Sequence, residues 1–332
     1  MLWDQKGDGD YPTCLTSGAD MAVDRDDTSA AAVSLLVILG PTASGKSDLA
    51  LRLARETGAE ILSVDSMQVY YGMDIGTAKA TELERAAVPH HAIDLVGPNE
   101  LFTVARFVEL ADQVIADAAD RQVPLIATGG TPLYYKALFD GLFEGPSADE
   151  AVRERLRATS NEELHRRLLE VDPVAGARIH VQDSRRLIRA LEVYELTGQP
   201  ITSFQTEWAA KQSRHQATWV GLNWDRDALN RRINARVKGM MTAGWLDETQ
   251  GLLEKYGCFS TTAGEATGYH ELGQHLAGKI ALDDAVEQIK MGTRQLARRQ
   301  IKWFRRFPDV THLPGEAPVE DNKQKILSIW RP

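Results

Sequence analysis

The chain has 332 residues, of which 43 % are hydrophobic and 26 % charged, with a formal net charge of −9. This composition is typical of a soluble globular protein with room for a large α/β core and a second lobe. It contains no apolar stretch of roughly 18 residues and no secretory signal, so we expect a cytoplasmic protein without a membrane partner. Two cysteines, Cys14 and Cys258, are too few for a disulfide framework or a four-ligand zinc site. Any bound metal is therefore expected to have oxygen ligands.

Residues 1–32 lack hydrophobic periodicity, and we expect a disordered or non-native extension, with Met21 as an alternative start. Residues 1–30 hold seven Asp against Lys6 and Arg25, so they account for −5 of the net charge. The rest of the chain is therefore close to neutral. Its total charge does not exclude a nucleic-acid partner, because local clusters of Lys and Arg decide that affinity.

A glycine-rich loop follows the first apolar run, residues 35–39, and precedes a helical pattern over residues 46–57. The loop reads Gly40, Pro41, Thr42, Ala43, Ser44, Gly45, Lys46 and Ser47. Such a loop between strand and helix directs backbone N–H groups and the helix dipole at an anion. Lys46 can reach terminal phosphate oxygens, and the Ser47 hydroxyl can bind Mg²⁺. The sequence therefore predicts a site for a phosphorylated ligand.

Further strands alternate with helices along the chain. Strands are expected at residues 60–64, 123–127 and 218–222, with a helix over 103–120. This order predicts an α/β fold with a P-loop parallel-sheet core and helices on both faces. Because ligands bind at the carboxyl ends of parallel strands, Asp65 and Thr131 should lie beside the phosphate loop.

Residues 145–214 are almost purely helical in pattern and rich in arginine, which predicts an all-helical insertion. Nine arginines lie between residues 153 and 189, at 153, 155, 157, 166, 167, 178, 185, 186 and 189. Acidic neighbours offset part of this charge, so a solvated, ion-paired surface is the alternative to a surface that binds nucleic acid. The catalytic core is then expected at 33–144 and 215–315, and a C-terminal tail at 316–332.

Helices are expected over residues 225–243, 246–255, 269–276 and 282–307. In the last helix, one stripe carries Leu296, Gln300, Trp303 and Phe307, and another carries Arg294, Arg298, Lys302 and Arg306. We expect the first stripe to pack inward and the second to face an anion.

Asp65 is the carboxylate that this interpretation places at a strand end near the loop, either as a helper of Mg²⁺ or as a general base. The strand that ends at Thr128 lacks the Asp typical of nucleotide-hydrolysing P-loop enzymes, which disfavours a kinase or ATPase. His90 and His91 have no third residue at metal-ligand spacing and are expected to be structural.

An ordered series of motifs runs through the chain. It comprises Gly40–Ser47, DSMQVY from Asp65, DIGTAK from Asp74, Pro89–His91, GGTPLY from Gly129, Asp172-Pro173, Arg178–His180, Arg186 with Arg189–Glu192, Gly268-Tyr269 and TRQLARRQ from Thr293. The series resembles the bacterial tRNA dimethylallyltransferase (tRNA isopentenyltransferase) family over residues 35–307. The departures at Ala80 and Val181-Gln182 fall on no expected catalytic position.

The resemblance implies transfer of a dimethylallyl group from its diphosphate to N6 of the adenosine 3′ of the tRNA anticodon (position 37). Asp65 would then be the base that takes the amine proton, and Thr131 would bond near the reacting atoms. The adenosine would have to flip into the pocket, where Asp65, Ser66, Met67 and Gln68 would read it. Loop amides, Lys46 and Mg²⁺ at Ser47 would neutralise the diphosphate.

The resemblance also implies tRNA contacts in three places. They are Arg153, Arg185, Arg186 and Arg189; Glu265, Gly268, Tyr269 and His270; and Arg294 with Arg298. The alternatives are a helical ion pair for Arg189 and core packing for Tyr269. We expect a monomer, because no heptad pattern indicates self-association.

Three other functions remain open from the residues. An adenylate isopentenyltransferase acting on free nucleotide shares the core but has little need for the insertion. A P-loop nucleotide kinase would use the same loop for ATP. A non-catalytic RNA-binding protein would leave the phosphate loop without a purpose.

Overall fold

The computed structural model describes residues 33–142, 145–204 and 213–332, so the expectation for residues 1–32 lies outside the described residues. Within these ranges six strands form one sheet in the order β3-β2-β4-β1-β5-β6, and every neighbouring pair is parallel. The strands are β1 (Leu35–Leu39), β2 (Glu60–Ser63), β3 (His90–His91), β4 (Leu125–Thr128), β5 (Thr218–Asn223) and β6 (Thr311–Pro314). The predicted parallel-sheet core is confirmed. The sequence analysis missed β3 and β6, which are the short strands at the two edges.

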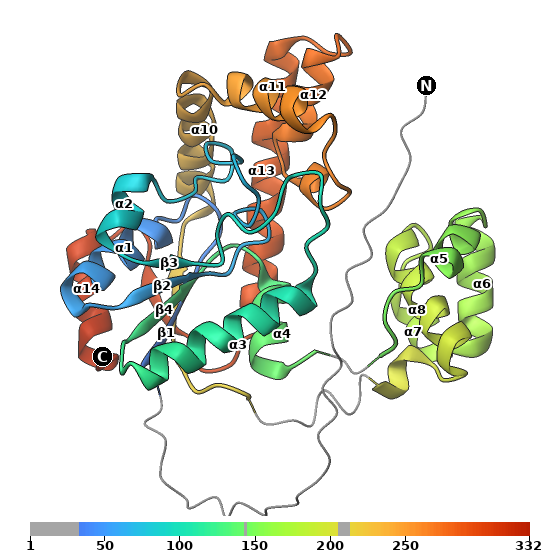
Figure 1. The fold of residues 1–332 in the computed structure, drawn as a ribbon, viewed down its shortest axis with the longest axis horizontal. Coiled ribbons are helices and arrows are strands. Elements are labelled where there is room, and N and C mark those ends of the chain that lie inside the picture. The colour runs from blue at the N-terminus through green and yellow to red at the C-terminus, as the bar shows by residue number, and fades with distance from the viewer. Residues whose placement is uncertain (1–32, 143–144, 205–212) are drawn as a thin grey trace, which may run out of the picture. The chain divides into compact units, whose positions relative to one another are not determined.

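Helices cover both faces of the sheet because its central strands are apolar on both sides. On one face, Leu35, Val37 and Leu39 pack with α3 (Val104–Asp120), α4 (Pro132–Asp140) and α13 (Leu282–Phe304). On the other face, Leu36 and Ile38 pack with α1 (Lys46–Thr57) and α14 (Val319–Ile329). Figure 1 shows α1 and α14 on one side of the strands and α3 and α4 on the other.

Residues 316–332, which the sequence analysis assigned to a tail, contain α14. Ile326 and Trp330 are buried against the α1 side of the sheet, and Lys323 pairs with Glu56 of α1 at 2.5 Å. Few apolar residues form the inner face of α14, so the hydrophobic periodicity that predicts a helix is weak in this part of the sequence.

The insertion has a hydrophobic core of its own. Its helices are α5 (Glu150–Arg157), α6 (Asn161–Val171), α7 (Pro173–Arg178) and α8 (Ser184–Thr197). Leu156, Leu164, Leu168, Leu187 and Leu191 form the centre of this core. Each helix begins at a side-chain cap, and the caps are Asp149, Ser160, Asp172 and Asp183. Local sequence therefore specifies these helices, and their leucines specify how they pack together.

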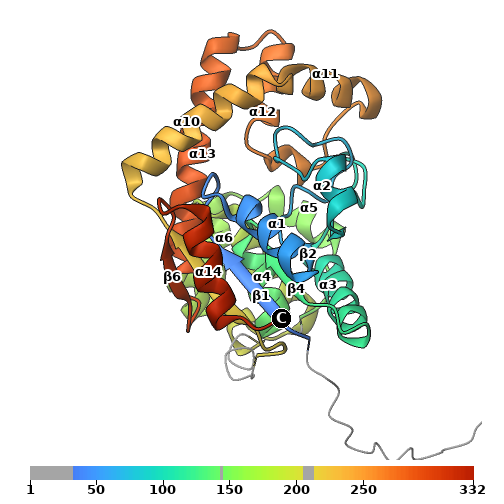
Figure 2. The same ribbon diagram turned by 90° about the vertical axis from the view of Figure 1, so that its left-hand side faces the viewer.

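A second helical group follows β5. It contains α10 (Arg226–Thr242), α11 (Trp245–Tyr256), the short 3₁₀ helix η1 (Ala263–Glu265), α12 (Tyr269–Leu276) and α13. Figure 2 shows α10, α11, α12 and α13 grouped together. The predicted bounds of α1 and α12 are confirmed, whereas α13 ends at Phe304 rather than Phe307. The six-residue helix α2 (Glu82–Ala87) precedes β3 and starts at a capping box of Thr81 and Glu84.

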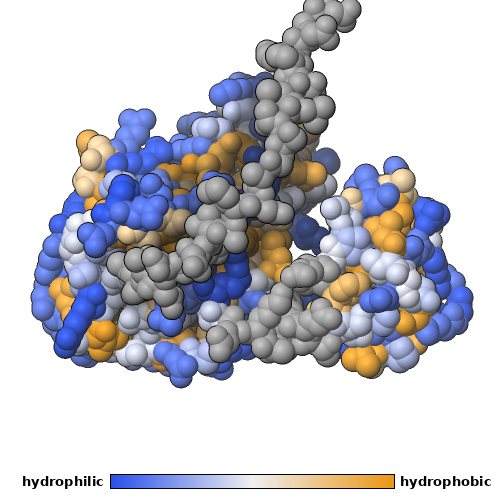
Figure 3. All heavy atoms as spheres, turned by 60° about the horizontal axis from the view of Figure 1, so that its bottom comes forward, coloured by the Kyte–Doolittle hydropathy of each residue, from blue (hydrophilic) through white to orange (hydrophobic). Residues whose placement is uncertain are grey.

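The surface is mixed in character. On the face drawn in Figure 3, hydrophilic side chains are interrupted by hydrophobic areas. Leu83 and Val174 are among the exposed hydrophobic residues, which is ordinary for a folded protein. Among the helices described, none has both the length and the apolar character needed to cross a membrane.

Candidate active site

The phosphate loop, Gly40–Ser47, joins β1 to α1 as predicted. Gly45 has φ of 90° and Ala43 has φ of 64°, so the chain turns through left-handed conformations before the helix begins. The Ser44 hydroxyl is buried, and it has no hydrogen-bond partner among the residues described. An orphaned donor beside free helix N-terminal amides fits the oxygens of a phosphate group.

Two side chains from a distant part of the chain fix the shape of this loop. Trp224 donates from its indole N–H to the Ser44 carbonyl oxygen at 3.1 Å, and Arg232 donates to the Ala43 carbonyl oxygen at 2.9 Å. The Arg232 guanidinium also lies over the Trp224 ring, 4.6 Å from its centre. These contacts engage two loop carbonyl oxygens and no loop N–H group.

Gln300 of α13 connects the phosphate loop to the loop after β4. Its side-chain oxygen accepts from the Thr42 N–H at 2.8 Å, and its amide nitrogen donates to the Gly130 carbonyl oxygen at 2.7 Å. Gln300 is buried, so these two bonds satisfy the amide away from solvent. The predicted inward-facing stripe of α13 therefore serves the site as well as the core.

Two cations face the loop. Burial first, and then the charge of Arg236, lowers the pKa of Lys46 from 10.5 to about 8, although Asp65 opposes this shift. Burial is also the main reason that the pKa of Arg236 is lowered. A bound polyanion would relieve the repulsion between these cations, so the site is electrostatically suited to a diphosphate.

Asp65 lies just past β2, where the ends of β2 and β4 approach closely. Its Oδ1 accepts from the Met67 N–H at 2.9 Å. A Cβ on Gly129 would lie 2.1 Å from the Val64 carbonyl oxygen, and one on Gly130 would lie 3.3 Å from Asp65 Oδ2. The two glycines therefore let Asp65 stand beside the second loop with one carboxylate oxygen directed toward it.

A cavity of about 260 Å³ joins these parts. Six of the predicted site residues line it: Thr42, Lys46, Ser47, Asp65, Met67 and Gln68. Residues of α10, α11 and α13 complete it, including Arg236, Trp245 and Leu296. The cavity therefore brings the phosphate loop and a carboxylate together in one space.

Thr131 has a structural contact in addition to its predicted catalytic role. Its hydroxyl oxygen accepts from the Ser66 N–H at 2.9 Å and its hydroxyl lies 3.2 Å from that of Ser66. Thr131 and Ser66 are not among the residues found to line the cavity in the described structure. Both hold the turn that carries Asp65.

The predicted tRNA contacts of the insertion fall into two groups. Arg153 and Arg189 both pair with Glu192, at 2.8 and 2.6 Å, and the Glu192 side chain is fully buried. Burial raises the pKa of Glu192, but hydrogen bonds from Arg153 and Arg189 outweigh it and hold that pKa below its ordinary value. These two arginines therefore stabilise the insertion, whichever ligand they also contact.

Arg185 and Arg186 differ from this pair. Arg185 pairs with Glu265 at 2.6 Å and Arg186 pairs with Asp183 at 3.4 Å, and all four side chains are exposed. Exposed ion pairs are weak, so both arginines can exchange a carboxylate for a phosphate at little cost.

The segment Glu265–His270 is only partly accessible. Tyr269 is buried and donates from its hydroxyl to Glu248 at 2.6 Å, whereas His270 is exposed beside Gln274. Gly268 has φ of 105°, and a Cβ there would lie 2.1 Å from the Trp245 ring. Tyr269 and Gly268 thus pack on Trp245, which lines the cavity, and His270 stays on the surface.

On α13, Arg294 donates to the Asn234 side-chain oxygen of α10 at 2.8 Å. Arg298, Arg299 and Lys302 are exposed, and no acidic partner occurs for them among the residues that the structure describes. This cationic stripe is therefore the part of the predicted tRNA surface that is not neutralised by the protein itself.

Sequence reasoning missed three residues of the site: Trp224, Arg232 and Arg236. Arg232 and Arg236 are four residues apart on the predicted helix at 225–243, and this spacing places both on one face. That signal was available in the sequence, whereas the contact of Trp224 with the loop depends on the tertiary fold.

His90 and His91 bind neighbouring groups in the sheet edge. His90 Nδ1 lies 2.7 Å from the Val88 carbonyl oxygen, and His91 Nε2 lies 2.7 Å from Glu60. Cys258 is a free, exposed cysteine.

The parallel sheet, the phosphate loop and the carboxylate in the same cavity are typical of a P-loop enzyme. The sequence model described as IPP transferase matches residues 68–307, and that described as isopentenyl transferase matches residues 33–88. The tRNA dimethylallyltransferase of Geobacter metallireducens is 45 % identical over 288 residues, which cover 85 % of this chain and 93 % of that protein. The corresponding protein of Geobacillus kaustophilus is 44 % identical, covering 82 % and 88 %.

Solved structures agree. A tRNA isopentenylpyrophosphate transferase from Bacillus halodurans is 37 % identical, with a TM-score of 0.67 over 89 % of this chain and 95 % of that one. A eukaryotic dimethylallyltransferase acting on tRNA is 28 % identical, with a TM-score of 0.78 over 90 % and 78 %. The chain therefore belongs to the IPP transferase family and is a transferase.

Proposed function

We propose that this protein transfers a dimethylallyl group from dimethylallyl diphosphate to N6 of the adenosine at position 37 of tRNA, next to the anticodon, and releases diphosphate. The relatives named tRNA dimethylallyltransferase support prenylation of tRNA rather than of a free nucleotide or phosphorylation by ATP. The observation that carries the proposal is the cavity that holds Lys46 and Asp65 together.

The phosphate loop would bind the leaving group. Loop amides, the orphaned Ser44 hydroxyl, Lys46 and Arg236 provide donors for a diphosphate. As the allylic C1–O bond breaks, the electron pair goes to the diphosphate, and donors placed in advance stabilise that charge.

The residues near the loop fit Mg²⁺. The Ser47 hydroxyl lies in the first turn of α1, Ser47 lines the cavity, and a hydroxyl oxygen is a ligand of the kind that Mg²⁺ takes. The described residues contain no group of three or more His, Cys, Asp or Glu that could hold a metal, which suits an ion bound largely through substrate phosphates and water. When bound, Mg²⁺ would neutralise diphosphate charge. Ser47 is the residue we assign to it.

Asp65 would act as the general base. The N6 amine forms a bond to C1 of the dimethylallyl group and must lose a proton, which the Asp65 carboxylate can accept. The contact from the Met67 N–H fixes one carboxylate oxygen and leaves the other for this proton.

The adenosine would have to leave the base stack to reach Asp65, because the cavity lies at the strand ends inside the protein. Met67 and Gln68 line the cavity and would contact the flipped base, and Ser66 and Thr131 would hold the turn behind it. The anticodon stem-loop would be bound through phosphates by Arg185, Arg186, His270, Arg294 and Arg298.

We further propose that the enzyme is a cytoplasmic monomer. Its expected substrate is tRNA, and the insertion and the sheet domain each bury their own hydrophobic clusters within one chain. Gel filtration with light scattering tests the monomer assignment.

Labelled dimethylallyl diphosphate, Mg²⁺ and either unmodified tRNA or AMP test the reaction. We expect label in tRNA with adenosine at position 37 and none in tRNA with guanosine there. Label in AMP alone would move the protein to the adenylate isopentenyltransferases. Phosphate transfer from ATP without prenyl transfer would indicate a kinase.

A further inference from the structure

The loop from Asp74 to Lys79 forms one wall of the cavity. Gly76, Thr77, Ala78 and Lys79 all line it, opposite the phosphate loop and next to Gln68. The segment lies between Tyr70 and α2 and belongs to no helix or strand. Its backbone closes two turns of its own, from the Ala78 N–H to the Ile75 carbonyl oxygen and from the Lys79 N–H to the Asp74 carbonyl oxygen, at 3.0 Å each. Side chains from other segments hold these turns in the cavity wall.

Glu248 of α11 binds the backbone of this loop. Its Oε2 accepts from the N–H groups of Asp74 and Ile75 at 3.1 and 2.7 Å, and its Oε1 lies 3.4 Å from the N of Gly76. The Tyr269 hydroxyl donates to the same Oε1 at 2.6 Å. Burial, followed by the Glu248 charge, holds the pKa of Tyr269 well above its ordinary range, so this hydroxyl stays a donor.

The loop is pressed against the aromatic side chains beside Glu248. A Cβ on Gly76 would lie 2.2 Å from the Trp245 indole nitrogen and 2.5 Å from the Tyr269 ring. The two rings meet edge to face with centroids 5.7 Å apart. The carboxylate therefore holds a backbone that packs without a gap on the α11–α12 pair.

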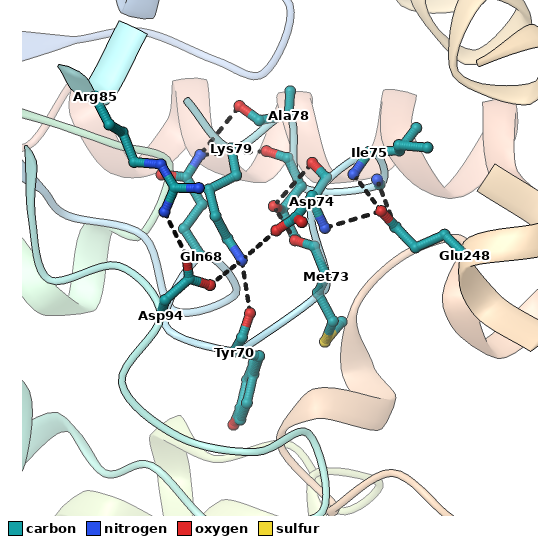
Figure 4. A network of polar contacts seen from close by, with 12 residues as sticks. Gln68, Tyr70, Met73, Asp74, Ile75, Ala78, Lys79, Arg85, Asp94 and Glu248 are labelled. Carbon is teal, nitrogen blue, oxygen red and sulfur yellow. Dashed lines mark hydrogen bonds and ion pairs between the residues drawn. The ribbon is translucent and has the colours of Figure 1, made fainter. Parts of the chain in front are cut away.

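Lys79 holds the other end of the loop. Its side chain is 1 % exposed, and its ammonium donates to the Tyr70 carbonyl oxygen at 2.7 Å and to Asp74 and Asp94 at 2.6 Å each. Figure 4 shows Glu248 and Lys79 on opposite sides of Asp74 and Ile75. The loop is thus fixed from two sides, by a carboxylate and by a buried ammonium.

Gln68 takes its orientation from this loop. Its amide nitrogen donates to the carbonyl oxygens of Thr77 and Ala78 at 3.3 and 3.4 Å, and its side-chain oxygen accepts from the Ser63 hydroxyl at 2.7 Å. Because the two ends of the amide have different partners, a shift of the loop would turn or release it.

We propose that Glu248 is a positioning residue for the acceptor adenosine, acting through the backbone of residues 74–78 on Gln68. This inference rests on the proposed function. Tyr269 lies in the segment expected to contact tRNA, so the same carboxylate ties that segment to the cavity wall. The phosphate loop shares none of these hydrogen bonds, so donor binding should be independent of Glu248.

Steady-state kinetics of Glu248→Gln and Tyr269→Phe test the inference. Glu248→Gln replaces one carboxylate oxygen with an amide NH₂ group, although the Tyr269 hydroxyl and the backbone N–H groups that contact Glu248 are all donors. We therefore expect kcat to fall and KM for tRNA to rise, each about tenfold. Tyr269→Phe removes one donor and should give about a threefold change in the same two quantities. The dissociation constant for dimethylallyl diphosphate should change less than about twofold in both variants.

Glu254→Gln is the matched control, because Glu254 lies on the same helix, is exposed and contacts only Gln250 among the hydrogen bonds described. It should behave as the wild type. Hydrogen exchange of residues 74–78 should accelerate in Glu248→Gln and not in Glu254→Gln.

A Glu248→Gln enzyme with wild-type kinetics, or one that loses donor and tRNA binding in equal proportion, would overturn the inference. If Glu248→Gln does not fold, Tyr269→Phe decides: an unchanged KM for tRNA and an unchanged kcat would overturn it. A wild-type protein that does not prenylate tRNA would instead overturn the proposed function, and this inference with it.

Discussion

In the insertion, arginines pair with carboxylates of the same domain. In the cavity, Lys46 of the phosphate loop and Arg236 of α10 are two cations that interact with each other and with Asp65. The insertion has more cations, yet its charge is largely balanced. The cavity has few cations, and burial first, then the charge of Arg236, lowers the pKa of Lys46. Unbalanced charge in an enclosed place, rather than the number of arginines, marks the anion site.

The largest expected effect is at the cavity. Lys46→Met removes a buried cation from the diphosphate site, so we expect kcat/KM for dimethylallyl diphosphate to fall about 10³-fold. Lys290→Met is the control, because Lys290 forms a surface pair with Glu287 and should leave kcat/KM unchanged. A fall of less than tenfold in Lys46→Met would contradict the assignment.

The second largest effect is expected on the stability of the insertion. Glu192→Gln leaves Arg153 and Arg189 without a buried carboxylate, so we expect the free energy of unfolding to drop by about 3 kcal/mol. Urea denaturation measures this, with the exposed Glu163→Gln as a control expected within about 0.5 kcal/mol of wild type.

The pH dependence of Glu192 follows from its lowered pKa. The stabilisation is complete above its ordinary pKa of 4.5 and is lost as the pH falls through the lower folded pKa. Glu192→Gln should lack this acid-dependent part of the unfolding free energy, and an identical pH profile in both proteins would argue against the pairing.

A smaller effect concerns the protonation of Lys46. Because its pKa is about 8, the free enzyme loses this charge as the pH rises from 7 to 9, and binding a diphosphate must take the proton back. We expect the dissociation constant of dimethylallyl diphosphate to rise about tenfold over that interval. Calorimetry in buffers of different ionisation enthalpy should detect proton uptake at pH 8 to 9, and its absence would count against a neutralised Lys46.

The smallest expected effect separates the two groups of insertion arginines. Arg186→Ala removes one exposed phosphate contact, so we expect KM for tRNA to rise about threefold and the salt dependence of binding to weaken by about one ion. The free energy of unfolding of Arg186→Ala should equal that of the wild type, whereas that of Arg189→Ala should be lower. Equal losses in the two variants would contradict the division of these arginines into an exposed group and a buried, paired group.

The sequence predicted the parts of the site that are local. The phosphate loop, Asp65 after β2 and the bounds of α1 depend on short patterns, and the structure contains them where the patterns occur. The family resemblance added which of these residues act together.

The parts that escaped prediction are non-local. Trp224 contacts Ser44 across 180 residues and Gln300 contacts Thr42 across 258, and no periodicity encodes such pairs. The Arg153–Glu192 pair likewise depends on how α5 packs on α8. Strand β3 has only two residues, which is too short for an alternating pattern.

The central claim is that Asp65 serves the chemical step, while the phosphate loop and Arg236 hold the donor. Asp65→Ala measures it directly, with turnover on tRNA and dimethylallyl diphosphate affinity determined on the same preparation. The account predicts that turnover is abolished while the dissociation constant of the donor stays within about threefold of wild type. Loss of donor binding in Asp65→Ala would contradict it, because the carboxylate would then belong to the diphosphate and Mg²⁺ site.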